Sequence, residues 1–319
     1  MMRKPDLSVD LNGLKLHNPI TVASGTFGFG REYSEYVDLN NIGAIMVKGL
    51  TLAPKLGNDS PRVAETAMGM LNSVGLQNPG VEYFLKNDLP WLGEFNTKVI
   101  ANINGTNIEE YCRIAELTSV KGVHSLELNI SCPNVKAGGL AFGTDPDMVY
   151  RVVKEVREAT GHHLIVKLSP NVKDIKDIAL AAEAGGADCL SMINTLTGMV
   201  IDIDSRKPIL ARGIGGLSGP AVKPVAVRMV YEAASVVGIP IIGMGGIANY
   251  RDAVEFLLAG AGAISIGTSN FVNPKVTEEV LNDLENWMMK NGYNSIDELV
   301  GKLDFPKANA GSCTFEVPK

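Results

Sequence analysis

A cysteine lies directly beyond a short apolar segment that carries two polar residues. The segment, residues 125–130, alternates leucine or isoleucine with Glu127 and Asn129, and Cys132 follows it. Because alternate side chains of a strand point to opposite faces, the two polar residues should face the interior of a barrel and need polar partners there. A lone cysteine is more often a small buried hydrophobe than a reactive group. The position of Cys132 past a strand end favours a reactive one.

Two lysines end apolar segments at separate places in the chain. Lys48 follows residues 45–47, and Lys167 follows residues 164–166. A buried ammonium group is costly without an anionic or acceptor partner. Either lysine alone could simply reach solvent at a strand end. The two together favour one shared anionic or electron-rich ligand.

Amide side chains recur at the same level of the predicted strands. They belong to Asn72, Asn102, Asn129 and Asn194, the last of which is followed by Thr195. Asparagine is common in turns, but Asn102 and Asn129 lie within predicted strands, where asparagine is depleted. An amide offers a donor and an acceptor without charge. The set therefore suits a planar ligand edged with carbonyl and N–H groups, such as a pyrimidine or a flavin ring.

Glycine-rich turns follow the last two predicted strands. One is Gly243-Met244-Gly245-Gly246, and the other is Gly267-Thr268. Glycine lets backbone N–H groups approach a phosphate, and the N-terminus of a following helix adds a favourable dipole. A tight turn would explain either sequence alone. Their occurrence at two neighbouring strand ends favours a phosphate-bearing ligand.

Strands that alternate with helices must position these residues. Short β-branched segments alternate with amphipathic ones, which predicts a parallel sheet with crossover helices. The predicted strands are residues 20–23, 44–47, 99–103, 125–130, 164–168, 189–193, 241–244 and 263–266, and the last predicted helix is 274–290. Eight such strands predict an α/β fold, a (β/α)8 TIM barrel. The alternative is an open doubly wound sheet, which the lack of a Gly-x-Gly-x-x-Gly turn after the first strand weakens.

The barrel is expected to form one domain over residues 1–319, with its core at about 18–290. The tail at about 306–319 has no assignable pattern. Asn12-Gly13 between two short alternating segments predicts an N-terminal β-hairpin, which should cover the bottom of the barrel. The connections 51–98 and 194–220 are too long for simple loops and predict insertions at the barrel mouth.

The segment after Cys132 is expected to act as a lid. Residues 133–144 have little apolar content and include Gly138, Gly139 and Gly143. Glycines make such a segment easy to move, and lids that exclude water are common over barrel mouths.

Charge and cysteine content argue against several classes of protein. The formal net charge is -6 at pH 7, which disfavours a nucleic-acid partner. The 4 cysteines show no metal-ligand spacing, so we expect no metal site, iron–sulfur cluster or disulfide framework in this chain. Cys112 and Cys189 lie within regular patterns and are expected to be inert. No signal peptide or membrane-spanning segment is recognisable, so we expect a cytoplasmic enzyme without a membrane partner.

These residues lie in segments that resemble the class 1 dihydroorotate dehydrogenases, specifically the catalytic subunit of class 1B. The resemblance extends from about residue 7 to residue 290, and several segments are long enough to be specific to the family. The matching segments are Ala23-Ser24-Gly25, residues 27–33, Lys48-Gly49, residues 69–80, residues 129–134, residues 166–171, residues 192–195, residues 216–220 and residues 243–246.

The resemblance implies that FMN lies across the barrel mouth with dihydroorotate stacked on it. The residues implied for the FMN phosphate are Gly219, Gly245, Gly246, Gly267 and Thr268. Those implied for the flavin ring are Ala23, Ser24, Lys48, Gly49, Asn102, Asn129, Lys167 and Ile193. Those implied for the substrate are Lys48, Asn72, Ser73, Val74, Gly75, Leu76, Asn129, Asn194 and Thr195.

Cys132 and Lys48 are the implied catalytic residues. Cys132 would remove a proton from C5 of dihydroorotate while a hydride passes from C6 to N5 of FMN. The product would be orotate, for pyrimidine biosynthesis. The membrane-associated class 2 enzymes use serine as the base and carry an N-terminal extension, and this sequence shows neither.

Two segments, residues 27–33 and 62–70, are more similar to class 1B than to class 1A. Class 1B implies a partner subunit with FAD and a 2Fe–2S cluster, which passes electrons to NAD+, around a homodimeric core within a heterotetramer. This chain lacks the cysteines for such a cluster, so the assignment requires the partner. The alternatives are a class 1A homodimer that uses fumarate, a flavin barrel of the dihydrouridine-synthase kind, and a phosphate-binding barrel without redox chemistry.

Overall fold

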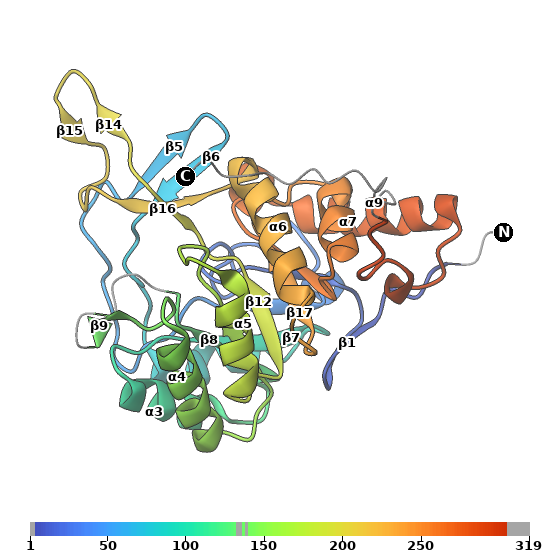
Figure 1. Cartoon of the computed structure of the whole chain (residues 1–319), viewed down its shortest axis with the longest axis horizontal. Helices are drawn as coiled ribbons and strands as arrows, with labels where there is room; N and C mark the ends of the chain where they lie inside the picture. The colour runs from blue at the N-terminus through green and yellow to red at the C-terminus, as the bar shows by residue number, and fades with distance from the viewer. Residues whose placement is uncertain (1–3, 132–135, 138–139, 305–319) are drawn as a thin grey trace, which may run out of the picture.

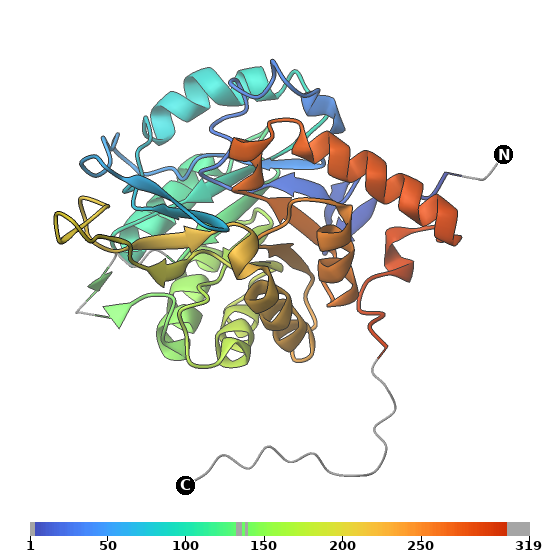
Figure 2. The same ribbon diagram turned by 90° about the horizontal axis from the view of Figure 1, so that it is seen from above.

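Parallel strands close into a barrel that helices surround (Figures 1 and 2). The computed structural model describes residues 4–131, 136–137 and 140–304. The barrel strands follow one another in sequence order: β3 (Ile20–Val22), β4 (Ala44–Met46), β7 (Lys98–Ile103), β8 (Ser125–Asn129), β11 (Leu164–Lys167), β12 (Cys189–Met192), β17 (Ile241–Met244) and β18 (Ala263–Ile266). Each strand begins within one residue of its predicted start, and the predicted (β/α)8 barrel is confirmed.

The longer helices cover the outside of the barrel (Figure 2). They are α3 (Ile108–Thr118), α4 (Pro146–Ala159), α5 (Ile175–Ala184), α6 (Lys223–Ala234), α7 (Tyr250–Leu258) and α9 (Val276–Asn291). Each presents an apolar face to the strands, which is why the strands themselves are buried on both faces. Four of these helices are preceded by a polar residue whose side chain accepts a hydrogen bond from a backbone N–H group of the first turn. These residues are Asn107, Asp145, Asp174 and Asn249.

The last long helix begins later than the predicted residues 274–290. Asn273 precedes α9, and its side chain accepts a hydrogen bond from the Lys275 amide at 3.0 Å. Its carbonyl accepts one from the Val276 amide at 3.1 Å. Asn273 therefore starts a turn through Pro274 and Lys275, the two residues at which the sequence pattern suggested helix. At the other end, Gly292 adopts a left-handed conformation with φ 78° and ends the helix.

The N-terminal hairpin lies at the amino ends of the barrel strands, as expected. It comprises β1 (Val9–Leu11) and β2 (Leu14–Leu16), and its turn residues Asn12 and Gly13 both have positive φ. The Asn12 side chain donates to the Asp188 carbonyl at 3.3 Å, just before β12. The Leu11 carbonyl lies 2.7 Å from Nε2 of His163, just before β11.

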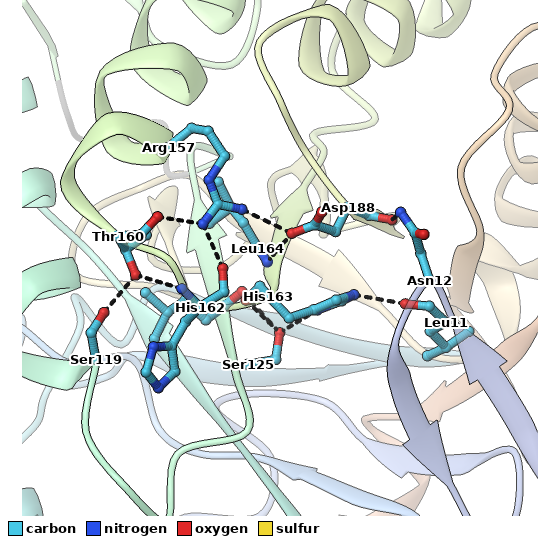
Figure 3. A network of polar contacts seen from close by, with 11 residues as sticks. Leu11, Asn12, Ser119, Ser125, Arg157, Thr160, His162, His163, Leu164 and Asp188 are labelled. Atoms are coloured by element: carbon cyan, nitrogen blue, oxygen red, sulfur yellow. Dashed lines mark hydrogen bonds and ion pairs between the residues drawn. The ribbon is translucent and has the colours of Figure 1, made fainter.

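Partly buried polar groups strengthen this junction (Figure 3). Nδ1 of His163 lies 2.8 Å from Oγ of Ser125 at the start of β8. The Asp188 carboxylate accepts hydrogen bonds from the Leu164 amide at 2.8 Å and from Arg157 of α4 at 2.9 Å. The hairpin is therefore tied to three neighbouring strands by side chains that are remote from it in sequence.

The two long connections meet in one antiparallel sheet at the opposite end of the barrel. The connection between β4 and β7 contributes β5 (Val63–Thr66) and β6 (Gly69–Asn72), and the one after β12 contributes β13 (Leu196–Gly198) and β16 (Gly215–Ser218). The strand order is β13-β16-β6-β5, with Leu217 opposite Leu71. The hairpin of β14 (Ile201–Asp202) and β15 (Lys207–Pro208) projects beyond this sheet (Figure 1). Their position at the mouth confirms the insertions, and their pairing was not predicted.

Short segments complete the described elements. The helical ones are η1 (Leu39–Asn41), α1 (Val81–Tyr83), η2 (Phe84–Asp88), α2 (Leu89–Leu92), η3 (Pro220–Val222), α8 (Ser269–Val272) and η4 (Ile296–Glu298). A two-stranded pair joins β9 (Lys136–Ala137) and β10 (Leu140–Ala141). Of the helices in the described ranges, none is long and apolar enough to cross a bilayer.

Candidate active site

A pocket of about 600 Å³ opens at the carboxyl ends of the barrel strands, beneath the insertion sheet. Its size is typical of a cavity for a cofactor or small ligand. The predicted site residues that the structure describes all line it: Ala23, Ser24, Lys48, Gly49, Asn72, Ser73, Val74, Gly75, Leu76, Asn102, Asn129, Lys167, Ile193, Asn194, Thr195, Gly219, Gly245, Gly246, Gly267 and Thr268. Residues far apart in sequence thus form one site.

The charged side chains that line the pocket within the described residues are cations. They are Lys48, Lys167 and Arg212. A cavity with cationic walls stabilises an anionic ligand, most strongly where water is excluded. Lys48 approaches close to Gly25, where an added Cβ would lie 3.5 Å from Nζ of the lysine. Arg212 was not predicted as a site residue, because no strand pattern surrounds it.

A buried carboxylate lies under the pocket floor. Glu127 of β8 is fully buried and accepts hydrogen bonds from the Asn102 side chain and, at 2.6 Å, from Oγ of Ser191. Its Oε2 lies 3.9 Å from Nζ of Lys167. The prediction that Glu127 faces the interior and finds polar partners is confirmed. The inference from Lys167 is weakened, because a protein carboxylate already compensates this lysine and it does not by itself require an anionic ligand.

Amide groups form a second network along one wall. Oδ1 of Asn129 accepts a hydrogen bond from Oγ of Ser131 at 2.6 Å, and that hydroxyl also accepts one from Nδ2 of Asn194. Oδ1 of Asn194 accepts from the Thr195 amide at 2.8 Å. Asn171, which follows β11, donates to the Thr195 carbonyl at 3.0 Å.

Sequence reasoning missed Ser131 and Asn171, although both line the pocket. The rule that singled out Asn194 would have found Asn171, because each is a polar residue just past a strand end. The same rule would have found Ser131, which directly follows the predicted strand at residues 125–130.

Close contacts between backbone segments explain the glycines at the end of the pocket where a phosphate is expected. Gly246 has φ 79°, and a Cβ there would lie 2.8 Å from the Gly219 carbonyl oxygen. At Gly219, with φ 101°, a Cβ would lie 2.6 Å from Cα of Gly69. Only glycine fits such approaches without a shift of backbone. Thr268 donates to Oγ of Ser218 at 2.8 Å and so joins this wall to β16.

Cys132 lies outside the residues that the structure describes, and so do parts of the expected lid at residues 133–144. Its neighbour Ser131 is buried in the pocket wall. Cys189 is fully buried, and burial raises the pKa of its thiol far above the ordinary range. Partial burial also raises the pKa of Cys112. The expectation that these two thiols are inert fits their positions.

Comparison with known proteins identifies the family. The family model for dihydroorotate dehydrogenase matches residues 6–288. The chain belongs to the dihydroorotate dehydrogenase family. It is therefore an oxidoreductase of a family whose members depend on FMN.

Individual relatives are similar over nearly their whole length. The chain is 55% identical over 298 residues to the Thermoanaerobacter pseudethanolicus protein named dihydroorotate dehydrogenase B (NAD(+)), catalytic subunit, and covers 99% of that protein and 93% of its own length. It is 54% identical to the Geobacter metallireducens protein of the same name, covering 99% of it and 95% of its own length. The fold matches the crystal structure of dihydroorotate dehydrogenase from Eimeria tenella, in complex with ferulenol, with a TM-score of 0.77. That match has 23% identity and covers 93% of this chain and 88% of the other.

The pocket fits FMN on two independent features of this structure. The glycine turns at Gly219, Gly245 and Gly246 leave backbone where side chains would otherwise fill the space, as phosphate binding requires. Lys48, Asn102, Asn129 and Lys167 line the pocket at β4, β7, β8 and β11, on other strands of the barrel than β17 and β18, and a flavin ring offers carbonyl and N–H groups along its edge to such side chains.

Proposed function

We propose that this chain is the FMN-binding catalytic subunit of a class 1B dihydroorotate dehydrogenase. It would oxidise dihydroorotate to orotate in pyrimidine biosynthesis, with NAD+ as the final acceptor. The observation that carries the proposal is that every described residue of the expected set lines one pocket with cationic walls. Relatives at 55% identity are named as catalytic subunits of the NAD+-dependent B type, which supports the choice of subclass.

The cofactor would be held by both ends of the pocket. Gly219, Gly245, Gly246, Gly267 and Thr268 would bind the phosphate, chiefly through backbone N–H groups. Ala23, Ser24, Lys48, Gly49, Asn102, Asn129, Lys167 and Ile193 would contact the ring. When bound, FMN supplies the acceptor for a hydride. Ser24 is already oriented, because its hydroxyl donates to the Val47 carbonyl at 2.7 Å.

The substrate would occupy the part of the pocket beneath the insertion sheet. Asn72 ends β6 and residues 73–76 follow it, while Asn194 and Thr195 follow β12. Amides can pair with the two ring N–H groups and carbonyls of a dihydropyrimidine, and the Lys48 ammonium can offset its carboxylate. Asn72 already donates to the Gly216 carbonyl at 3.3 Å, which ties the substrate wall to β16.

Cys132 is our candidate for the general base. Its sulfur would take the proton from C5 of the substrate, and Lys48 would hold the substrate carboxylate. A thiol acts as a base only as the thiolate, whose ordinary pKa is about 8.5. Support comes from the residue before it, because the buried Ser131 is held in the pocket wall by hydrogen bonds with Asn129 and Asn194.

We further propose a partner that carries FAD and a 2Fe–2S cluster, bound to a homodimer of this chain in a heterotetramer. The rim around the insertion sheet exposes several large apolar side chains, which favours burial against another protein surface. They include Leu56, Val63, Met68, Ile203 and Ile214. The cytoplasmic location stays a prediction.

The deciding experiment is reoxidation of the reduced, isolated chain in a stopped-flow instrument. The protein as purified should be yellow, release FMN and not FAD on denaturation, and be reduced by dihydroorotate. It should transfer electrons slowly to NAD+ alone and rapidly once the partner is added. Rapid reoxidation by fumarate would instead favour class 1A. Rapid reoxidation by NAD+ without a partner would refute the two-subunit arrangement, and absence of flavin would refute the proposal.

A further inference from the structure

Lys223, the first residue of α6, lies directly behind the glycine turn that follows β17. A Cβ added to Gly246 would lie 2.8 Å from Cβ of Lys223 and 3.0 Å from its amide nitrogen. The lysine Nζ lies 2.7 Å from Oδ1 of Asp252 and 2.6 Å from Oε1 of Glu255, both on α7. One side chain therefore joins the start of α6 to the first two turns of α7, across the glycine turn.

Asp252 holds the segment between that turn and α7. Its other oxygen, Oδ2, accepts hydrogen bonds from the Ala248 amide at 2.9 Å, the Asn249 amide at 3.2 Å and the Asn249 side chain at 2.9 Å. Asp252 is 7% exposed, so these bonds are shielded from solvent. The loop from Gly246 to Asn249 is thus pinned at one end by contact with α6 and at the other by the Asp252 carboxylate.

The negative charges behind this loop would repel a bound phosphate unless a cation balanced them. Asp252 and Glu255 bring two carboxylates to the back of the turn where we place the FMN phosphate. Like charges at short range repel, and burial strengthens the repulsion from Asp252 more than from Glu255, whose side chain is 48% exposed. Lys223 contacts both carboxylates and leaves one net negative charge in the three-residue group. Gly246 and Ile247 line the pocket in front of the group.

We propose that Lys223 and Asp252 are positioning residues for the FMN phosphate. This inference rests on the proposed function. Asp252 holds the phosphate loop in its binding conformation. Lys223 ties α6 to α7 and neutralises one of the two carboxylates. Because the group lies behind the phosphate end of the pocket, its effect is specific for the phosphate and does not extend to the flavin ring.

The test compares two ligands that share the ring and differ in the phosphate. The complete chain is freed of flavin and titrated with FMN and with riboflavin, with flavin fluorescence as the signal. In Lys223→Met, the Kd for FMN should rise about tenfold or more, since two unbalanced carboxylates then lie behind the phosphate loop. The Kd for riboflavin should stay within about twofold of that of the wild-type chain.

Two further variants make the result specific. Arg228→Met is the matched control, because Arg228 is also on α6 and pairs with Glu232 at 2.6 Å, one helical turn away on the exposed surface. It should change neither Kd. Adding Glu255→Gln to Lys223→Met removes one of the unbalanced carboxylates and should recover much of the lost FMN affinity. Asp252→Asn should weaken FMN more than riboflavin for the other reason, because it removes the carboxylate that accepts from the Ala248 and Asn249 amides and holds the loop.

An equal rise in the Kd for FMN and for riboflavin in Lys223→Met would show a merely structural role and overturn the inference. Unchanged FMN affinity in Lys223→Met would overturn it as well, as would failure of Glu255→Gln to restore binding. If the wild-type chain binds neither flavin, the proposed function itself fails, and the inference fails with it.

Discussion

Glu127 offers the sharpest test of how the barrel interior is held together. Its carboxylate is fully buried, bonded to Asn102 and Ser191, and lies 3.9 Å from the Lys167 ammonium. At that distance and an effective dielectric constant of about 20, the attraction within the pair is about 4 kcal/mol. Removing one partner of a buried pair typically costs about 3–5 kcal/mol, because the other charge is left uncompensated. We therefore expect Glu127→Gln to lower the free energy of unfolding by about 3 kcal/mol or more.

The assay is urea unfolding of the flavin-free chain, because a bound cofactor would add its own stabilisation. Lys167→Met and the double variant complete a cycle. The loss of unfolding free energy in the double variant should be about 1–3 kcal/mol smaller than the sum of the losses in the two single variants, since the double variant leaves no unpaired charge. Ser191→Ala is the control, with a loss of about 1.5–3 kcal/mol for a bond to a charged group. Strictly additive losses in the cycle would refute the reasoning.

Three further predictions concern the site and the hairpin. Cys132→Ala should keep FMN but be reduced by dihydroorotate about 10²–10⁴-fold more slowly, with Cys112→Ala as the control; equal rates in the two variants would place the base elsewhere. Gly246→Ala should weaken FMN binding about tenfold or more, because a Cβ there would lie 2.8 Å from the Gly219 carbonyl oxygen; unchanged binding in a titration would show that the loop can shift. Burial lowers the pKa of His163, so its contribution to stability is complete above the unfolded pKa of about 6.5 and is lost as the pH falls through the lower folded value. The free energy of unfolding should differ less between pH 8 and pH 5 in His163→Gln than in the wild-type chain, and an equal difference in the two proteins would contradict this.

Local patterns were sufficient to predict the barrel and the polar and glycine residues at its mouth, whereas other pocket residues, such as Ala23 and Val74, were implied by the family resemblance. Each barrel strand is a short apolar segment whose period and β-branched content can be read without knowing its neighbours. In a closed parallel barrel, the carboxyl ends of all strands meet at one mouth. Polar and glycine residues at predicted strand ends, such as Lys48, Asn194 and Gly245, were therefore expected to converge, and these three line the pocket.

The sequence by itself thus determined the order of strands and the edge at which the polar residues lie. Only the tertiary structure decided which of these residues touch. Glu127 is the partner of Lys167, and β6 pairs with β16 although a large part of the chain separates them. Lys223 of α6 forms an ion pair with Asp252 of α7. Such contacts depend on the barrel geometry and side-chain packing between distant segments, and the period of a single strand or helix carries no record of them.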